Sequence, residues 1–394
     1  MKVTVLVGGR FFAFDIAREL QRQEMLAGVV TAYGRAPKEG IGWTRLRWNP
    51  LVEAVSRWER RRGRIPDPEI DFRASSRFGR WAARNLPRCD VLQGWTGYTL
   101  ESIPVAQARG TTVMATRASA HIRTQAELLE AEYGAFGFAA APVSPRMIER
   151  ECEEYERADY VQVFSTFALK SFLERGFARE RMVLTPLGVD MAEVAPAGEG
   201  PAPRRGGEGP LRVLYLGQVG LRKGAHYLLD AAKRLGPEAV SVSLVGGLAP
   251  EGELLLRRHA AGDEWKGKVP RSELRRVFAE HDVLILPSVE DGFGAVVCEA
   301  MAAGLPVIAT TSTGGPDVID DGRTGVIIPP ASVDAIAESL AAFADDRERC
   351  REMGRAAAEA MRTTRTWRQF VDDMVAQYGA ARARRVTGAD ACAS

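Results

Sequence analysis

The sequence lacks the features that would place it across a membrane or in a disulfide framework. No apolar run reaches about 18 residues, the length that a membrane-spanning helix needs. The five cysteines are scattered, odd in number and without Cys-x-x-Cys spacing, so neither disulfides nor a zinc site are expected. Residues 1–9 are too short for a signal-peptide core. We therefore expect a cytoplasmic protein.

Strong charge of one sign is also missing. The formal net charge is +2 over 394 residues, which does not indicate a nucleic-acid partner. Hydrophobic residues make up 46% of the chain and charged residues 26%, as in ordinary globular proteins. The length favours two or three domains, with enough residues for two sizeable cores.

Apolar strands alternate with helical stretches along most of the chain. This alternation predicts an α/β fold with parallel sheets covered by helices on both faces. Strands are expected at residues 2–7, 91–92, 112–115, 160–164, 182–185, 211–216, 241–245, 283–286, 307–309 and 325–328. The alternation breaks at residues 195–210, which are rich in proline and glycine and carry no apolar periodicity.

The break predicts two Rossmann-like domains that face a central cleft. The N-terminal domain is expected at residues 1–195, a linker or exposed loop at 196–210, and the C-terminal domain at 211–365. Ligands of such sheets bind beyond the carboxyl ends of the strands. Functional side chains are therefore expected in the loops that follow strands.

One strand, loop and helix in the C-terminal domain carry the strongest signal. Gly292 and Gly294 follow the strand 283–286 and would let backbone amides approach a ligand, and the helix start adds unpaired N–H groups. Asp291 and Glu299 lie eight residues apart, so both can face one pocket. The alternative is that Asp291 only caps the helix and Glu299 is solvated. The apolar neighbours of Glu299 argue against that alternative, because a buried lone Glu is costly.

The stretch from Asp291 to Glu299 resembles the acid-x7-acid signature of retaining nucleotide-sugar glycosyltransferases of family four. The family usually has Glu-Gly-Phe-Gly at this point, whereas this chain has Asp291, which is shorter by about 1.5 Å. Glu290, the residue before Asp291, does not have the spacing to Glu299 that the signature requires. The resemblance implies that Asp291 holds donor-sugar hydroxyls and Glu299 the ribose hydroxyls. It also implies a donor-binding role for the residues between them, Gly292, Phe293, Gly294 and Ala295.

The same resemblance implies the GT-B fold, with the acceptor on the N-terminal domain and the donor on the C-terminal domain. In that fold the last helix crosses back to the first domain. Residues 366–382 are the candidate for this helix, and residues 383–394 are expected to be a flexible tail.

Positive charge for a departing diphosphate is expected from side chains. The chain contains no Asp-x-Asp triplet, the usual metal holder of the other glycosyltransferase fold. Arg222 and Lys223 follow the strand 211–216 in the loop that begins with Gly217, where diphosphate oxygens should lie. Much of the family has Arg where this chain has Gln218, and Arg222 would replace that charge. The alternative is a solvated pair at a loop tip.

Three weaker signals complete the expected site. Gly9 lies in a loop that resembles the family's glycine loop, although a tight turn without a ligand explains it nearly as well. Val269 lies in a segment that resembles the one whose backbone contacts the nucleobase. His121 follows the strand 112–115, and the resemblance implies a contact with the donor sugar; a structural role is the alternative.

Together these residues predict a retaining, metal-independent glycosyltransferase of the hexosyltransferase type. It would need no cofactor besides its nucleotide-sugar donor, and its hydroxyl acceptor would be a glycan, a lipid-linked molecule or a small molecule. Two alternatives are a sugar-nucleotide binding protein without turnover and a nucleotide-sugar epimerase. No dedicated acid and base pair supports the epimerase.

An arginine- and tryptophan-rich segment lies in the N-terminal domain. Residues 43–90 contain twelve arginines, six acidic residues, no lysine and four of the seven tryptophans. This composition is typical of a peripheral contact with an anionic membrane, here the inner face. The alternative is a solvated basic face with tryptophans in the local core.

Overall fold

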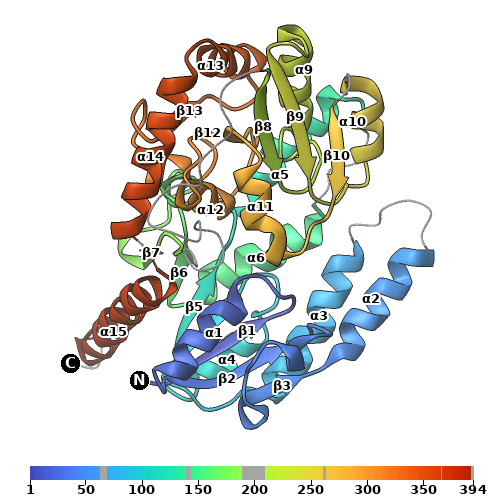
Figure 1. Ribbon diagram of the computed structural model, residues 1–394. Helices are drawn as coiled ribbons and strands as arrows, with labels where there is room; N and C mark the ends of the chain where they lie inside the picture. Colours follow the sequence, from blue (N-terminus) through green and yellow to red (C-terminus); the bar gives the residue numbers. More distant parts are fainter. Residues whose placement is uncertain (63–68, 139–142, 189–208, 261–262, 365, 392–394) are drawn as a thin grey trace.

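The computed structural model describes residues 1–62, 69–138, 143–188, 209–260, 263–364 and 366–391. Two parallel sheets, of seven and six strands, each carry helices on both faces and form two domains (Figure 1). The expected α/β fold is therefore confirmed. Most of the expected linker, residues 196–208, lies outside the described residues.

The N-terminal sheet has the strand order β3-β2-β1-β4-β5-β6-β7, and all its neighbouring strands are parallel. Its strands are β1 (Val3–Val7), β2 (Leu26–Thr31), β3 (Leu46–Trp48), β4 (Val91–Trp95), β5 (Thr112–Thr116), β6 (Tyr160–Val163) and β7 (Met182–Leu184). Its helices are α1 (Ala13–Arg22), α2 (Pro50–Arg62), α3 (Glu69–Arg84), α4 (Ser102–Gln107), α5 (Ile122–Ala135), α6 (Pro145–Arg157) and α7 (Thr166–Leu173). The short 3-10 turns are η1 (Ala36–Lys38), η2 (Trp43–Arg45) and η3 (Arg179–Arg181).

The C-terminal sheet has the order β10-β9-β8-β11-β12-β13 and is also parallel. Its strands are β8 (Leu211–Leu216), β9 (Val240–Val245), β10 (Glu264–Gly267), β11 (Val283–Leu286), β12 (Val307–Thr310) and β13 (Gly325–Ile328). Its helices and 3-10 turns are α9 (Ala225–Leu235), α10 (Gly252–His259), η4 (Arg271–Glu273), α11 (Leu274–Ala279), α12 (Val296–Ala302), η5 (Gly315–Asp317), α13 (Val333–Asp345) and α14 (Arg347–Thr364).

The central strands read as continuous apolar runs because both of their faces are covered. Every residue of β1, β4, β5, β11 and β12 is buried. Three strands, β2, β3 and β10, were not among the expected ones. β3 and β10 lie at sheet edges and carry exposed residues, and β2 contains Gly28.

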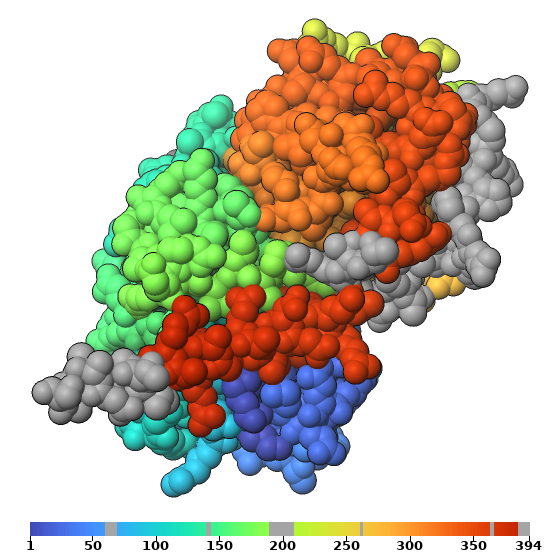
Figure 2. All heavy atoms as spheres, turned by 90° about the vertical axis from the view of Figure 1, so that its left-hand side faces the viewer, coloured from blue at the N-terminus to red at the C-terminus, as the bar shows by residue number. Residues whose placement is uncertain are grey.

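The last helix, α15 (Trp367–Ala391), packs on the N-terminal domain. Figure 2 shows it in red, lying across the blue and green surface of that domain. The Tyr378 hydroxyl donates to Gln162 Oε1 (2.7 Å), and the Tyr160 hydroxyl donates to the carbonyl of Ala381 (3.0 Å). The expected tail, residues 383–394, is helical as far as Ala391, because α15 continues to that residue.

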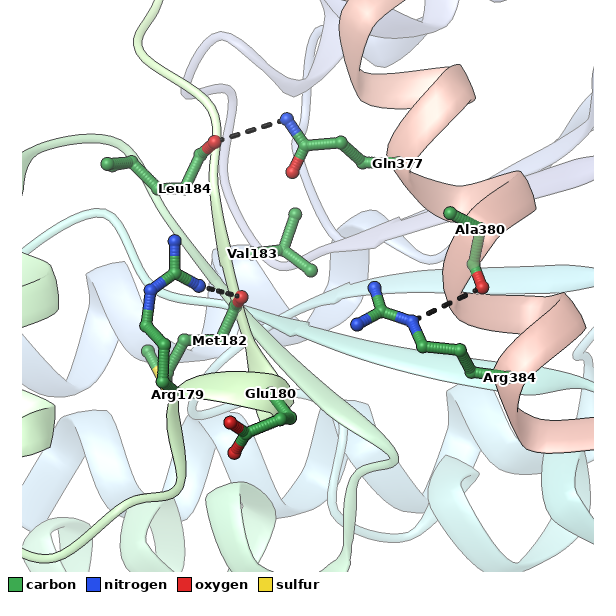
Figure 3. A pocket seen from close by; sticks show the side chains of 8 residues that line it. All are labelled: Arg179, Glu180, Met182, Val183, Leu184, Gln377, Ala380 and Arg384. Carbon is green, nitrogen blue, oxygen red and sulfur yellow. Dashed lines mark hydrogen bonds between the residues drawn. The ribbon is translucent and has the colours of Figure 1, made fainter. Parts of the chain in front are cut away.

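A groove lies between the edge strand β7 and α15 (Figure 3). Gln377 donates to the Leu184 carbonyl across it (3.2 Å), and Arg179 lies on the other side. Its lining includes none of the candidate site residues. Among the described helices, none is both long and apolar enough to cross a membrane.

Candidate active site

Two loops meet at the carboxyl ends of the neighbouring strands β8 and β11. We name residues 217–224, between β8 and α9, the donor loop; the acidic loop, residues 287–295, lies between β11 and α12. Gly224 has a φ of +66°, and a Cβ there would lie 1.9 Å from the carbonyl oxygen of Pro287, so only glycine fits. The Val289 amide donates to the Arg222 carbonyl (3.0 Å). The glycine and this bond hold the two loops together.

Each cation of the donor loop contacts a carboxylate of the acidic loop. Lys223 Nζ pairs with Asp291 Oδ2. Arg222 Nη1 pairs with Glu290 Oε2 at 3.0 Å. The structure thus brings Arg222, Lys223 and Asp291 together, as the sequence predicted, and adds Glu290, whose side chain is fully buried.

Burial and charge shift the pKa values of this cluster in defined directions. Burial lowers the pKa of Lys223, even though Asp291 opposes the shift. Burial by itself would raise the pKa of Asp291, but Lys223 and Arg222 outweigh it and lower that pKa. Burial by itself would lower the pKa of Arg222, but the carboxylates of Glu290 and Asp291 outweigh it, so the pKa of Arg222 is raised. The cluster therefore keeps Asp291 ionised and holds charge at the end of the sheet.

Glu299 lies on α12 and pairs with a residue that sequence reasoning missed. Arg271 Nη2 lies 3.3 Å from Glu299 Oε1 and belongs to η4, directly after the segment that contains Val269. Only 14% of the Glu299 side chain is exposed, against 50% for Arg271. Arg271 is also close enough to Arg10 and Asp15 to influence their pKa values, which places it opposite the loop that contains Gly9.

The acidic loop touches the N-terminal domain where its glycines lie. A Cβ on Gly292 would lie 2.1 Å from the carbonyl oxygen of Ala118, in the loop after β5. Gly294 has a φ of +74°. The side chain of Phe293 is buried in the core and lies against Gly314. The carbonyl of Phe293 accepts from the Gly314 amide (2.9 Å), so Phe293 fixes the acidic loop from within.

The remaining donor-binding candidates lie at strand or helix ends. The Gly217 amide donates to the Val245 carbonyl (2.9 Å) at the ends of β8 and β9. Ala295 is the residue before the first turn of α12. Val269 is partly buried against the core, and Gly9 follows β1 in a bend.

His121 is not placed to bind a donor sugar. Its side chain is buried in the N-terminal domain between the rings of Tyr155, Phe172 and Phe177. Its Nδ1 accepts from the Arg123 amide (3.2 Å) and so caps α5. Burial lowers its pKa to about 3, with help from nearby arginines. The expectation of a catalytic His121 is therefore wrong, and its role is structural.

Arg117 lies directly after β5 and is close enough to Glu290 for that carboxylate to favour its charged form. Its guanidinium pairs with Glu151 at 2.7 Å and donates to the Ala120 carbonyl (3.0 Å) and to Gln125 Oε1 (2.7 Å). These bonds fix the loop 117–121 that faces Gly292. In the described part of the chain, no group of three or more His, Cys, Asp or Glu side chains could hold a metal ion.

Comparisons with known proteins show which sequences and folds this chain resembles. Residues 202–360 match the family described as Glycosyl transferases group 1. A putative colanic acid biosynthesis glycosyltransferase, WcaL of Escherichia coli, is 27% identical over 201 residues, 48% of either chain. D-inositol 3-phosphate glycosyltransferase of Pseudarthrobacter chlorophenolicus is 33% identical over 191 residues, 45% of this chain and 46% of the relative. The match thus spans about half the length of these relatives.

Two solved structures share the whole architecture. Sucrose-phosphate synthase of Thermosynechococcus elongatus superposes with a TM-score of 0.71 and 20% identity, over 99% of this chain and 100% of that one. HepE of Anabaena, in complex with UDP and glucose, gives a TM-score of 0.68 and 15% identity, over 96% of this chain and 100% of that one. The expected GT-B fold is confirmed, and residues 202–360 match the glycosyl transferases group 1 family.

Proposed function

We propose that this protein is a retaining glycosyltransferase that moves a sugar from a nucleoside diphosphate sugar to a hydroxyl acceptor without a bound metal. The observation that carries the proposal is the contact of Arg222 and Lys223 with the acidic loop at the ends of β8 and β11. Two cations there can neutralise a diphosphate, while Asp291 can accept hydrogen bonds from sugar hydroxyls.

The proposed reaction proceeds on one face of the donor sugar. The bond between the anomeric carbon and the phosphate oxygen breaks, the acceptor oxygen forms the new bond, and the acceptor proton passes to the departing phosphate. Arg222 and Lys223 stabilise the developing negative charge, Asp291 holds sugar hydroxyls, and Glu299 with Arg271 lines the nucleotide side. No pair of opposed carboxylates is required for this route.

The first donor to test is UDP-glucose, because the HepE structure contains UDP and glucose. Thermal unfolding should be measured with UDP-, GDP- and ADP-sugars, since a bound donor raises the melting temperature by mass action. Transfer to a panel of glycan, lipid-linked and small-molecule hydroxyl acceptors should persist in EDTA, and NMR of the product should show retained anomeric configuration. Loss of transfer in EDTA would contradict metal independence, and stabilisation without transfer would favour a binding protein.

For the acceptor side, we propose a peripheral contact with an anionic lipid surface. Leu51, Val55 and Trp58 recur at helical spacing on α2, with 71%, 40% and 53% of their surface exposed. Trp43, nearby on η2, is 69% exposed. The twelve arginines of residues 43–90 supply the matching positive charge.

Co-sedimentation with vesicles tests this surface. Vesicles rich in phosphatidylserine should retain the protein more than phosphatidylcholine vesicles, and a Trp43→Ser/Trp58→Ser variant should bind less. Binding to neither vesicle at low salt would overturn the membrane contact and leave the glycosyltransferase proposal standing.

A further inference from the structure

Glu290 crosses the cleft to the N-terminal domain. Its Oε1 accepts from the Ala120 amide at 3.0 Å, and its Oε2 accepts from Gln125 Nε2 at 2.8 Å. The same Oε2 pairs with Arg222 at 3.0 Å. One fully buried carboxylate therefore binds both a cation of the donor loop and the start of α5.

A second buried carboxylate repeats this arrangement further along α5. Glu251 Oε1 accepts from the Tyr133 hydroxyl (2.8 Å) and from the amide of Leu221, the donor-loop residue before Arg222 (3.0 Å). Only 6% of the surface of Glu251 is exposed. Gln125 and Tyr133 lie eight residues apart on α5, which extends from the N-terminal domain to the other half of the molecule (Figure 1).

We propose that Glu290 and Glu251 are positioning residues through which α5 orders the donor loop. The inference rests on the proposed function, because it assigns Arg222 to the donor diphosphate. Each carboxylate shares its oxygens between the two domains, so loss of the α5 partner frees the donor loop to move. Contact between the domains would then set the position of Arg222 at the step that transfers the sugar.

The chain supplies a contrast for this role. Thr166 and Asp317 also bond across the cleft, but the contact is exposed and involves neither the donor loop nor the acidic loop. A solvated contact of this kind contributes little to stability, and it makes no bond to the loop that carries Arg222. Thr166→Val is therefore the matched control for Gln125→Ala and Tyr133→Phe.

Hydrogen exchange gives the test that does not depend on activity. Gln125→Ala and Tyr133→Phe should speed exchange in peptides that cover residues 219–224, whereas Thr166→Val should leave those peptides unchanged. Exchange that stays at the wild-type rate in both α5 variants would overturn the inference. If the wild type shows no sugar transfer at all, the proposed function fails, and the exchange result still decides the coupling.

Kinetics then tests the link to Arg222. Glu290→Gln should lower kcat roughly tenfold to a hundredfold, with a smaller change in the donor KM, because a shift of about 1 Å in a positioned group costs that much. In an Arg222→Ala background, Glu290→Gln should lower kcat little further, because each variant already breaks the same Glu290–Arg222 ion pair. Independent, multiplicative losses would contradict a role through Arg222.

Discussion

Gly292 in the C-terminal domain lies directly against the backbone of Ala118 in the N-terminal domain. A methyl group on Gly292 would lie 2.1 Å from the carbonyl oxygen of Ala118 and 2.5 Å from the Cα of Ser119, far inside van der Waals contact. Backbone atoms cannot move aside as a flexible side chain can. The two domains can therefore approach this closely only with glycine at position 292.

Gly292→Ala should separate the domains and slow sugar transfer while each domain stays folded. We expect kcat to fall roughly a hundredfold, because the acceptor side would be displaced by about 1 Å or more. Steady-state kinetics and small-angle scattering check this. Gly134→Ala on α5 is the control, since a Cβ there meets nothing within 4 Å. Wild-type kcat in Gly292→Ala would show that the approach is not needed.

Lys223→Met should lower kcat by roughly a hundredfold to a thousandfold, the loss expected when one charge-stabilising contact is removed. The variant also leaves Asp291 without its ion-pair partner, so Lys223→Met/Asp291→Asn is needed to separate charge stabilisation from misfolding. If the double variant recovers the wild-type melting temperature but has a lower kcat than Asp291→Asn alone, Lys223 acts on the reaction. Lys233→Met, on the exposed face of α9, is the matched control and should keep full activity.

The sequence predicted the central strands and the proximity of Arg222, Lys223 and Asp291, because these signals are local. β8 and β11 are apolar runs that lead straight into Arg222, Lys223 and Asp291, and neighbouring parallel strands bring such loops together. The edge strands β3 and β10 have no comparable run, because the sheet edge leaves part of each strand in solvent.

Long-range contacts explain what the sequence could not predict. Glu290 bonds to Ala120 across 170 residues, and no local pattern marks that partner. His121 does follow a strand, as expected, but its ring turns into a cluster of aromatic residues that arrive from α6 and α7. The sequence predicted correctly that His121 follows a strand, but the direction of its side chain is set by packing against distant residues.

Tyr378→Phe should loosen α15 from the N-terminal domain. The Tyr378 hydroxyl is one of three donors to Gln162 Oε1, with Gln93 and Thr116, in a buried network. Losing it should reduce the free energy of unfolding by about 1 kcal/mol. Arg382 lies on the same helix as Tyr378 and forms a partly exposed ion pair with Asp90, directly before β4. Arg382→Ala breaks this pair and should reduce the free energy of unfolding by less. Denaturant titration measures both losses. Equal losses would show that the buried Tyr378 hydroxyl stabilises the protein no more than the partly exposed ion pair does.

The stability of the protein should depend on pH through His121. The folded pKa of about 3 lies below the unfolded value of 6.5, so the unfolded state binds the proton first as pH falls. The stability that neutral His121 contributes is thus complete above pH 6.5 and is lost as the pH falls from there toward 3. Between pH 7 and pH 5 the loss should be about 2 kcal/mol in the free energy of unfolding.

His121→Asn isolates this contribution, because asparagine can still cap α5 but does not titrate. The variant is expected to be less stable than the wild type at pH 7, since it loses the packing against Phe172. Its stability should nevertheless change less between pH 7 and pH 5. Denaturant titrations at both pH values give the comparison, and the difference between the proteins cancels the other titrating groups. Parallel pH dependence in the two proteins would show that His121 takes up a proton in the folded state as easily as in the unfolded chain.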